Sequence, residues 1–583
     1  MDKEKHNYGM QDGLDLDMLI IGAGVSGLYT GWRLLSGEYK EGPKSARAGA
    51  APRVHVLEAS HRIGGRLETL FLEGMPHVRG EFGGMRYLSS HLLVANLVNF
   101  LGLRNTFFPM GDGNNLFYLR GKRYRSSELA AATKDKNFPY RMAKGERGVS
   151  PYTLFNQVFQ NVLAAGGMQP PNTAEQWNEL KTNLMYKGKH IYDVGFWNMM
   201  LDELSNEGFN YVADAGGYYS NIVNGGAGEG MEEIMGDFSS NPTYLTLEHG
   251  YDQIPIGLAK QFKRYGGEIW SRNRLLKLER GRNGKIKAHI ENWTHKKWTI
   301  TARHVVLGMP RRSLELLDPT SFIFESGQLA QDVATVIKEP AHKLFMGYES
   351  PWWRKAPLNL QSGEAVTDLP IRQTYYFGTE CEQAGGEKGN TNSLLMAGYN
   401  DMWSMYFWKG LELKDQQSND LEGDPTKRKR YLKALEQDEG SHNPYRMRPY
   451  RAMKKKPLSA PGEGPGIDVY MASEAMVHYA QMQLREIHGV RIPDPYIAAF
   501  RDWSQDPFGA GYHAWATNVN VEEVMKRMRK PLKDANVYIC GEAYSDNQGW
   551  VEGALTTTEK MVQDHLGLKW PKDWLPEDYY LGW

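Results

Sequence analysis

Cysteine is scarce in this sequence: only Cys381 and Cys540 occur among its 583 residues. The two lie far apart, and neither stands in the Cys/His spacing that is typical of a zinc site. The sequence therefore predicts neither a disulfide-stabilised scaffold nor a bound metal ion.

An excess of charge of one sign is also missing, because 69 Lys and Arg residues balance 69 Asp and Glu residues. We therefore expect no nucleic-acid partner. No apolar run approaches the roughly 18 to 20 residues that a membrane-spanning helix needs. The first residues, MDKEKHNYGMQDGLDLD, lack the apolar segment of a signal peptide. We expect no membrane partner, a cytoplasmic location and, from the length, two or three domains.

A glycine motif stands near the start of the chain, in the stretch LDMLIIGAGVSGLYTGWRLL. Residues 18–21 predict a buried strand and residues 28–35 a helix. Between them, Gly22, Gly24 and Gly27 have the G-x-G-x-x-G spacing. In this pattern the glycines allow a tight turn, a close approach to a pyrophosphate and close helix packing, and the N–H groups of the helix start face the phosphates. The motif predicts a Rossmann-like dinucleotide-binding unit.

A second predicted strand, VHVLEAS, ends at Glu58, whose carboxylate suits the two hydroxyls of a ribose. Glu58 follows Gly22 at more than the usual spacing of about 20 residues. We attribute the excess to the polar insertion EGPKSARAGAAP that separates them. The simpler interpretation of Glu58 is a solvated charge at the end of a strand.

Four further segments resemble the flavin amine oxidase family, in the order in which that family has them. HRIGGRLETL places Gly65 and Arg66 after the acidic strand end, and NVYICGEAYSDNQGWVEGALTTTEKMV carries Glu542, Gly549 and Trp550. The other two segments are HGYDQIPIGLAKQF and HVVLGMPRRSLELL. Over nearly its full length the chain resembles this family and, within it, the L-amino acid oxidases.

The resemblance implies an α/β (α+β) fold of amine oxidase architecture. We expect a Rossmann-like FAD-binding domain from residues 14–80, 243–325 and 531–567, a mixed-sheet substrate domain from 81–129 and 330–530, and a helical domain from 130–240. The polar segment 411–466 is interpreted as a surface insertion or an oligomer contact.

The implied cofactor is FAD, bound non-covalently, because Cys540 lies inside the predicted strand before Gly541 and not in an attachment motif. The expected contacts of the FAD come from the motifs above and from their neighbours: Gly22, Gly24, Gly27, Glu58, Ala59, Gly65, Arg66, Gly84, Met85, Arg86, Leu275, Glu542, Gly549, Trp550 and Val551.

The stretch GEFGGMRYLSSH carries Arg86 where the family's L-amino acid oxidases hold the substrate carboxylate. A guanidinium offers a carboxylate two parallel N–H donors and stays charged when partly buried. The alternative is a structural salt bridge. In TDLPIRQTYYF, either Tyr375 or Tyr376 is implied to bind the same carboxylate. Neighbouring strand residues point to opposite faces, so only one of them faces the flavin.

Two further residues are implied to stand beside the flavin ring. Trp550 forms one wall of the amino-group pocket, where an apolar surface disfavours the charged ammonium. Lys343, in AHKLFMGYESPWW, aligns with the lysine that holds a water at flavin N5, although such a side chain also snorkels to solvent. In GAGYHAWATN, Tyr512 and Trp515 resemble a loop that lines the substrate cavity, and we favour an ordinary hydrogen-bonded role for His513.

The predicted reaction is hydride transfer from Cα of an L-amino acid to FAD. It yields a 2-oxo acid, ammonia and, with molecular oxygen, hydrogen peroxide. We expect large apolar, aromatic or basic substrate side chains, and a homodimer or higher homo-oligomer. Asp214 is a candidate partner for a basic substrate, although a helix cap or a surface charge is the simpler interpretation. The alternatives are an amino acid 2-monooxygenase, an amine or polyamine oxidase, and an interaction module whose FAD only stabilises the fold.

Overall fold

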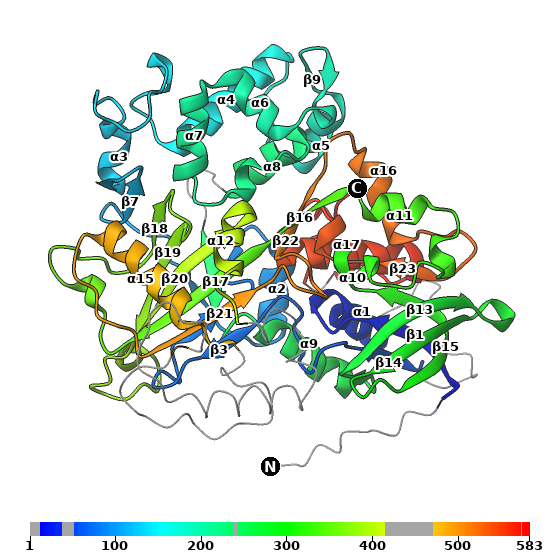
Figure 1. Cartoon of the computed structure of the whole chain (residues 1–583). Helices are drawn as coiled ribbons and strands as arrows, with labels where there is room; N and C mark the ends of the chain where they lie inside the picture. Colours follow the sequence, from blue (N-terminus) through cyan, green and yellow to red (C-terminus); the bar gives the residue numbers. More distant parts are fainter. Residues whose placement is uncertain (1–11, 38–51, 238–242, 414–449, 451–469, 573) are drawn as a thin grey trace.

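The computed structural model describes residues 12–37, 52–237, 243–413, 450, 470–572 and 574–583 (Figure 1). Most of the predicted insertion at 411–466 and most of the insertion after the first helix lie outside the described residues. Among the described residues, no helix is both long enough and apolar enough to cross a membrane.

The glycine motif forms a strand, a turn and a helix, as predicted, but both elements are longer than expected. Strand β1 is Leu14–Ile21 and helix α1 is Val25–Ser36. The first half of β1 alternates apolar and acidic residues, so a search for a continuous apolar run begins too late. Helix α1 starts directly after the extended Gly24, which places Gly27 in the first helical turn.

The first of two large sheets is built around β1 and is mostly parallel. Strands β2, β1, β15 and β23 run parallel, so their carboxyl ends all lie at the same edge of the sheet. This arrangement confirms the Rossmann-like sheet. The strand order is β12 (Glu268–Trp270), β2 (Val54–Leu57), β1, β15 (Lys297–Leu307), β14 (Ile286–Asn292) and β13 (Asn273–Arg280), with β23 (Val537–Ile539) also paired to β15.

The second large sheet is mixed, as expected from the resemblance. Strand β18 runs parallel to β7, whereas the other neighbours are antiparallel. The strand order is β21 (Ile497–Asp502), β17 (Ala341–Tyr348), β20 (Ser393–Asp401), β19 (Gln373–Thr379), β18 (Glu364–Thr367), β7 (Leu116–Leu119) and β8 (Lys122–Arg125). Lys343 therefore lies on β17, and the two candidate tyrosines lie on β19.

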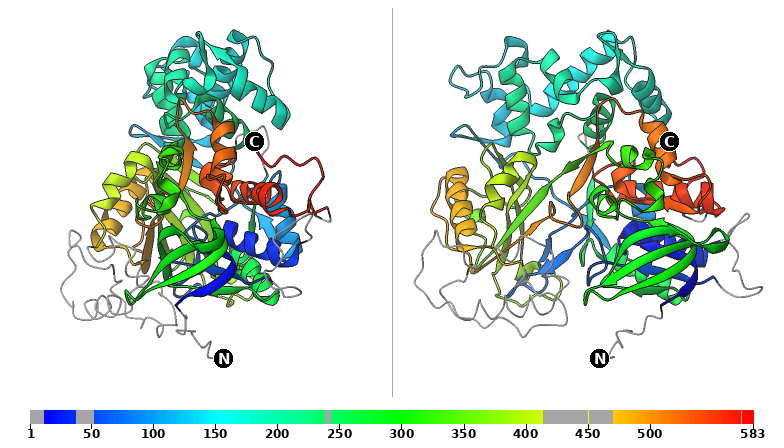
Figure 2. Two further views of the ribbon diagram at one scale, coloured as in Figure 1. Left: turned by 90° about the vertical axis from the view of Figure 1, so that its right-hand side faces the viewer. Right: turned by 45° about the vertical axis from the view of Figure 1, so that its right-hand side comes forward.

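A layer of helices lies above both sheets, at the top of both views in Figure 2. Ser150 begins the first of these helices by accepting a hydrogen bond from the N–H of Thr153, and Pro151 occupies the first helical position. The layer has its own buried apolar core. Its helices are α4 (Pro151–Ala165), α5 (Ala174–Asn183), α6 (Phe196–Glu203), α7 (Asn206–Ala215) and α8 (Ala227–Asp237).

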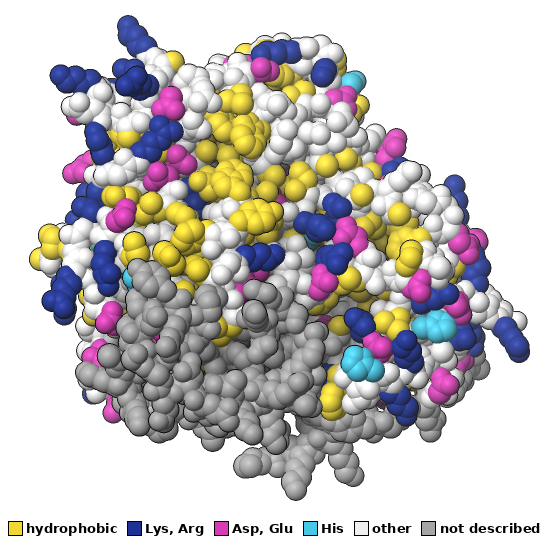
Figure 3. Space-filling model, viewed as in Figure 1, with side chains coloured by type: hydrophobic (Ala, Val, Ile, Leu, Met, Phe, Trp, Pro, Cys, Tyr) yellow, Lys and Arg dark blue, Asp and Glu magenta, His cyan; other side chains and the backbone are white. Residues whose placement is uncertain are grey.

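Smaller elements connect these layers. Figure 3 shows hydrophobic side chains across the middle of one face, and the exposed aromatic residues include Trp403, Tyr406 and Phe407 at helix α12. The domain boundaries stay a prediction. The remaining main elements are α2 (Leu92–Phe100), α3 (Ser126–Ala132), α9 (Gln253–Arg264), α10 (Arg311–Glu315), α11 (Gln328–Val333), α12 (Met405–Lys409), α15 (Glu474–His488), α16 (Val521–Arg529), α17 (Val551–Leu566), β3 (Thr69–Phe71), β4 (Arg79–Glu81), β5 (Tyr87–Leu88), β6 (Asn105–Phe107), β9 (Met185–Tyr186), β10 (Lys189–His190), β11 (Tyr244–Leu247), β16 (Val336–Glu339) and β22 (Tyr512–Trp515).

A buried ion pair joins the first helix of the chain to the last one described. Arg33 on α1 donates from Nε and Nη2 to the two carboxylate oxygens of Glu559 on α17, at 2.9 Å each. The hydroxyl of Tyr29 donates to the same carboxylate at 2.6 Å. Both charged side chains are almost completely buried, so each charge needs the other to compensate the loss of its hydration.

We expect Glu559→Ala to lower the free energy of unfolding by about 3 to 5 kcal/mol, because it leaves the Arg33 guanidinium buried without its carboxylate. Glu522→Ala removes the partner of Lys526 in an exposed pair one helical turn apart and should cost less than about 1 kcal/mol. Urea denaturation followed by circular dichroism measures both. Equal effects in the two variants would contradict the conclusion that the buried pair of Arg33 and Glu559 stabilises the fold.

Candidate functional site

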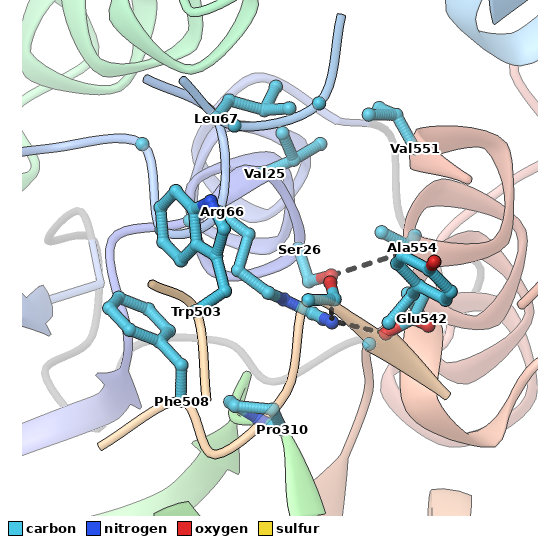
Figure 4. A pocket seen from close by; sticks show the side chains of 18 of the residues that line it. Val25, Ser26, Arg66, Leu67, Pro310, Trp503, Phe508, Glu542, Val551 and Ala554 are labelled. Atoms are coloured by element: carbon cyan, nitrogen blue, oxygen red, sulfur yellow. Dashed lines mark hydrogen bonds and ion pairs between the residues drawn. The ribbon is translucent and has the colours of Figure 1, made fainter. Parts of the chain in front are cut away.

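A cavity of about 310 Å³ runs from the glycine turn toward the second sheet. Figure 4 shows Arg66 crossing it toward Glu542, with Trp503 and Phe508 on one wall. The loops that line the cavity follow β1, β2, β15, β21 and β23, which are elements far apart in the sequence. The cavity therefore lies at the carboxyl edge of the first sheet, where such sheets bind nucleotides.

The glycine turn has the shape that a pyrophosphate requires. Gly22 has φ +101°, and a Cβ there would lie 2.5 Å from the carbonyl oxygen of Gly308. A Cβ on Gly24 would meet only the Cα of Gly65, at 3.7 Å, so it would point into the cavity. Gly27 does not line the cavity, although the sequence predicted a cofactor contact for it. Its missing Cβ would lie 2.0 Å from the Gly22 carbonyl oxygen, so Gly27 acts through packing of the turn.

Glu58 lies at the end of β2 and lines the cavity together with Ala59 and Leu275. Its two carboxylate oxygens accept hydrogen bonds from the N–H groups of Ala23 and Ser60, each at 2.8 Å. These bonds fix the carboxylate and leave each oxygen with a lone pair for a further donor. A ribose with two neighbouring hydroxyls suits this position.

Glu542 is the centre of a buried hydrogen-bond network on the cavity wall. Its carboxylate forms an ion pair with Arg66 at 2.7 Å and accepts from the N–H of Gly549 at 2.9 Å. It also accepts from His513, through the backbone N–H and through Nδ1, both at 3.0 Å. The nearby guanidinium and these donors hold the pKa of Glu542 well below its usual range, despite burial. His513 therefore has the structural role that the sequence favoured.

The two other residues of the His513 segment differ in their placement. Tyr512 lines the cavity, as expected, and its hydroxyl lies 3.2 Å from the Oγ of Ser220. Trp515 does not line the cavity. Its indole N–H donates to the carbonyl oxygen of Ser545, and its ring packs in the core beside the first sheet.

Arg86 lines the cavity between aromatic rings. Its guanidinium carbon lies 4.6 Å from the ring centre of Tyr244 and 5.4 Å from that of Phe108. Its Nη1 atom donates to the sulfur of Met110 at 3.0 Å and to the hydroxyl of Tyr375 at 3.3 Å. Arg86 is almost fully buried, so these contacts hold the cation in one place at the cavity wall.

The structure distinguishes the two candidate tyrosines by the face of β19 on which they stand. Tyr375 points toward Arg86, and its hydroxyl also lies 3.4 Å from that of Tyr218, a residue that lines the cavity. Tyr376 points the opposite way, and its hydroxyl bonds to Nε2 of His488 at 2.7 Å. Of the two positions that the sequence left open, Tyr375 belongs to the Arg86 group and Tyr376 to the opposite core.

Lys343 is buried in the cavity wall and does not reach solvent. Its Nζ donates to the carbonyl oxygens of Glu81 at 3.0 Å and Gly83 at 2.5 Å. Burial, together with the Arg86 charge, lowers the pKa of Lys343 to about 7. Burial also raises the pKa of the Glu81 carboxyl to about 7. Both groups consequently change charge near neutral pH.

The remaining predicted site residues, Gly65, Gly84, Met85, Trp550 and Val551, all line the same cavity. Trp550 also makes an edge contact with the ring of His91, with ring centres 5.0 Å apart. The sequence analysis missed several other lining residues. Tyr218 and Ser220 follow Asp214 closely in the sequence, and Trp503 stands in RDWSQDPF, directly before the segment GAGYHAWATN, whereas Tyr399 and Glu233 carry no local signal. Other lining residues that the sequence analysis missed include Ser26, Gly83, Asn221, Asn273, Met309, Pro310 and Phe508.

Asp214, a candidate partner for a basic substrate, does not line the cavity. Its carboxylate accepts from the hydroxyl of Tyr140 at 2.7 Å and lies 3.9 Å from Nη1 of the buried Arg372. Because Asp214 lies at the end of α7, its side chain stands between the helical layer and the second sheet. The sequence favoured a helix cap or a surface charge over a substrate contact for Asp214, and in the structure its carboxylate is a structural charge outside the cavity lining.

The residues of the cavity fit a flavin dinucleotide. A tight glycine turn with open space beside Gly24, a fixed carboxylate at Glu58 and a cation at Arg66 suit its pyrophosphate and ribose. Both cysteines are free, and burial raises the pKa of the Cys540 thiol to about 11. A thiol in that state is a poor nucleophile.

Comparisons with known proteins agree with this geometry. The chain is 24% identical to Aplysianin-A of Aplysia kurodai over 574 residues, which cover 94% of this chain and 90% of that protein. It is 26% identical to an L-amino-acid oxidase of Mus musculus over 391 residues, which cover 66% of this chain and 54% of that protein. The fold is similar to that of a putrescine oxidase solved with putrescine, with a TM-score of 0.58, 15% identity and coverage of 95% and 99% of the two chains.

The sequence pattern that describes flavin containing amine oxidoreductases matches residues 25–410 and 445–564, which is most of the chain. This match covers helix α1, the Arg86 segment, the lysine of β17 and the start of α17. The cavity and the match together show that the chain belongs to the family of flavin-containing amine oxidoreductases.

Proposed function

We propose that this protein is an FAD-dependent L-amino acid oxidase that forms a 2-oxo acid, ammonia and hydrogen peroxide. The proposal rests on Arg86, a buried cation in the wall of the cavity that also contains the glycine turn and Glu58. The relatives that are named L-amino-acid oxidase support the same activity. The cytoplasmic location and the homo-oligomer expected from the sequence stay predictions.

Arg86 and Tyr375 bind the substrate carboxylate in this proposal. A guanidinium presents two parallel donors to a carboxylate, and the rings of Tyr244 and Phe108 hold it in the required plane. The Tyr375 hydroxyl lies next to the guanidinium and donates its hydrogen to Oε1 of Gln373 at 2.8 Å, and in this proposal the substrate carboxylate replaces Gln373 as the acceptor. Fixing the carboxylate also fixes the direction of the Cα–H bond.

Trp550 and the neighbouring rings exclude water from the amino group. When bound, FAD supplies the hydride acceptor and passes the electrons to oxygen, which yields hydrogen peroxide. The substrate has to lose the ammonium proton before a hydride leaves Cα, and an apolar wall beside the nitrogen favours the neutral amine. Trp550 provides such a wall in this proposal, held by its contact with His91.

Lys343 holds a water molecule close to the reacting ring in this proposal. The carbonyl oxygens of Glu81 and Gly83 orient its amino group. Because burial lowers its pKa to about 7, Lys343 is a cation at pH 6 and mostly neutral at pH 9. A cation at this place stabilises negative charge that develops on oxygen.

The proposed activity can be tested on the purified protein. Denaturation should release the flavin into the supernatant, and mass spectrometry should identify it as FAD. Without oxygen, L-amino acids should bleach the flavin, whereas D-amino acids and amines should not. After air is admitted, peroxide and a 2-oxo acid should appear. Bleaching by amines would indicate an amine oxidase, amide and carbon dioxide a monooxygenase, and no bleaching a flavin that only stabilises the fold.

We expect Arg86→Ala to lower the second-order rate constant of flavin reduction by L-amino acids at least 100-fold, because the carboxylate loses a charged, bidentate partner. Tyr375→Phe should lower it about tenfold, through the loss of one hydrogen bond. Tyr376→Phe is the matched control and should change it less than threefold. Stopped-flow spectroscopy without oxygen measures all three, and equal effects of the two tyrosine variants would contradict the separate roles of Tyr375 and Tyr376.

Lys343→Met should slow reoxidation of the reduced flavin by oxygen about 10- to 100-fold at pH 6, because it removes a cation beside the ring. The loss should be smaller at pH 9, where wild-type Lys343 is mostly neutral. Glu81→Gln is the control, since Glu81 also titrates near pH 7. A pH dependence that survives in Lys343→Met and vanishes in Glu81→Gln would assign it to Glu81.

A further inference from the structure

Tyr399 lines the flavin cavity, and the proposed reaction does not use it. It lies on β20, directly opposite Lys343 of β17 in the antiparallel ladder. Side chains that stand opposite each other in such a ladder lie on the same face of the sheet and interact. The Tyr399 ring is therefore a direct neighbour of the lysine that the proposed reaction places at the flavin.

The two side chains are in contact. The Nζ atom of Lys343 lies over the Tyr399 ring, 4.6 Å from its centre. The negative face of an aromatic ring attracts a cation within about 6 Å, and the attraction is strongest where water is excluded. Lys343 is buried. Desolvation raises the pKa of the Tyr399 phenol well above its usual range, so the ring carries no charge of its own. The contact thus favours the charged form of Lys343 over the neutral form.

A second ring supports the orientation of Tyr399. The Tyr218 ring meets it at an interplanar angle of 84°, with ring centres 5.1 Å apart. This edge-to-face arrangement is one that aromatic pairs prefer. Tyr218 comes from the loop between α7 and α8 of the helical layer, and its hydroxyl lies 3.4 Å from that of Tyr375. The helical layer therefore helps to fix the Tyr399 ring beside the lysine.

Two charged groups on the cavity side act on Lys343 in opposite directions. Burial lowers the pKa of Lys343 most, the charge of Glu81 raises it, and the charge of Arg86 lowers it again. The Glu81 carboxyl is itself only partly ionised at neutral pH, because burial raises its pKa to about 7. Among the described residues, Nζ contacts the carbonyl oxygens of Glu81 and Gly83 and the ring of Tyr399. Of these three contacts, the ring is the one that a substitution can remove.

The strand on the other side of β17 places a further cation near Lys343. Arg501 of β21 lies opposite Lys343 in that ladder. Its Nε lies 3.5 Å from the Glu68 carboxylate, and its guanidinium carbon lies 4.4 Å from the centre of the Trp503 ring. The charge of Arg501 is therefore compensated by partners of its own. The balance between charged and neutral Lys343 is decided by the groups on the cavity side.

We propose that Tyr399 is a positioning residue for Lys343. The face of its ring holds the amino group on the carbonyl oxygens of Glu81 and Gly83 and keeps it charged to a higher pH than burial alone allows. The inference rests on the proposed function, in which a charged Lys343 promotes the reaction of the reduced flavin with oxygen. That reaction slows as rising pH removes the proton of the lysine. Tyr399 therefore extends the pH range of fast reoxidation upward.

The test follows reoxidation without any amino acid substrate. The flavin-bound protein is photoreduced without oxygen and then mixed with oxygenated buffer in a stopped-flow instrument, between pH 5 and pH 9. The wild-type rate constant should fall as the pH rises, with a midpoint at about 7, where Lys343 loses its proton. In Tyr399→Leu the midpoint should lie lower by about half a pH unit or more, because the cation loses the ring.

Three further variants complete the test. Tyr399→Phe keeps the ring and removes only the hydroxyl, so its midpoint should equal that of the wild type. Tyr399→Met fills the space with a flexible side chain and repeats the measurement should Tyr399→Leu not fold. Tyr376→Leu is the matched control, because it removes a buried ring from the opposite face of β19 and should not move the midpoint. At pH 5, where Lys343 is charged in all of these proteins, Tyr399→Leu should react within about twofold of the wild type.

The outcomes separate this inference from the proposed function. An unchanged midpoint in Tyr399→Leu or Tyr399→Met, or an equal change in Tyr399→Phe or Tyr376→Leu, refutes the role of Tyr399 while the oxidase activity stands. A slow reaction of Tyr399→Leu that persists at pH 5 refutes it too, since general damage to the site does not depend on the charge of the lysine. A pH dependence that survives in Lys343→Met overturns both roles. If no L-amino acid bleaches the flavin, the proposed function itself fails, whereas reoxidation after photoreduction still tests Tyr399.

Discussion

The Glu542 carboxylate is the contact on which the cavity depends. It forms an ion pair with Arg66 and accepts hydrogen bonds from His513 and from the end of the loop before α17. Taking a carboxylate out of water is costly, and only a full set of donors compensates it. All of these segments must therefore be in place together. Strand β22, which follows the second sheet along the chain, is thereby joined to the loop after β23 of the first sheet through this one charged group.

Charge is separated inside a molecule whose total charge is zero. Arg66, Arg86 and Lys343 line the parts of the cavity that meet anionic or electron-rich groups. Glu58 provides negative charge at the ribose end, and Glu233 provides it elsewhere on the cavity wall. In a low-dielectric cavity such placement acts strongly on a bound ligand, because little water screens it. A balanced composition thus gives no information about the potential at the site.

The sequence predicted the parts of the site that local backbone geometry requires. The glycine turn is a contiguous pattern, because a close approach to a phosphate restricts neighbouring residues together, and Glu58 ends the next predicted strand. The Glu542 segment, Arg86 and Trp550 were found by resemblance. The choice between Tyr375 and Tyr376 depends on the side of a strand, which a pair of identical residues does not show. The direction of Asp214 likewise depends on packing at the end of α7, so the sequence could only weigh a substrate contact against a structural charge.

The ion pair between α1 and α17 also affects how the chain is made. Arg33 and Glu559 are separated by 526 positions, and ribosomes add roughly 5 to 20 residues per second. The first helix therefore waits on the order of half a minute to two minutes before its partner exists. During that time the side of α1 that packs against α17 is uncovered, and such non-local pairing is slow and prone to aggregation. The nascent polypeptide has no complete dinucleotide cradle until the residues of α17 leave the ribosome, so cofactor capture is a late event of biosynthesis.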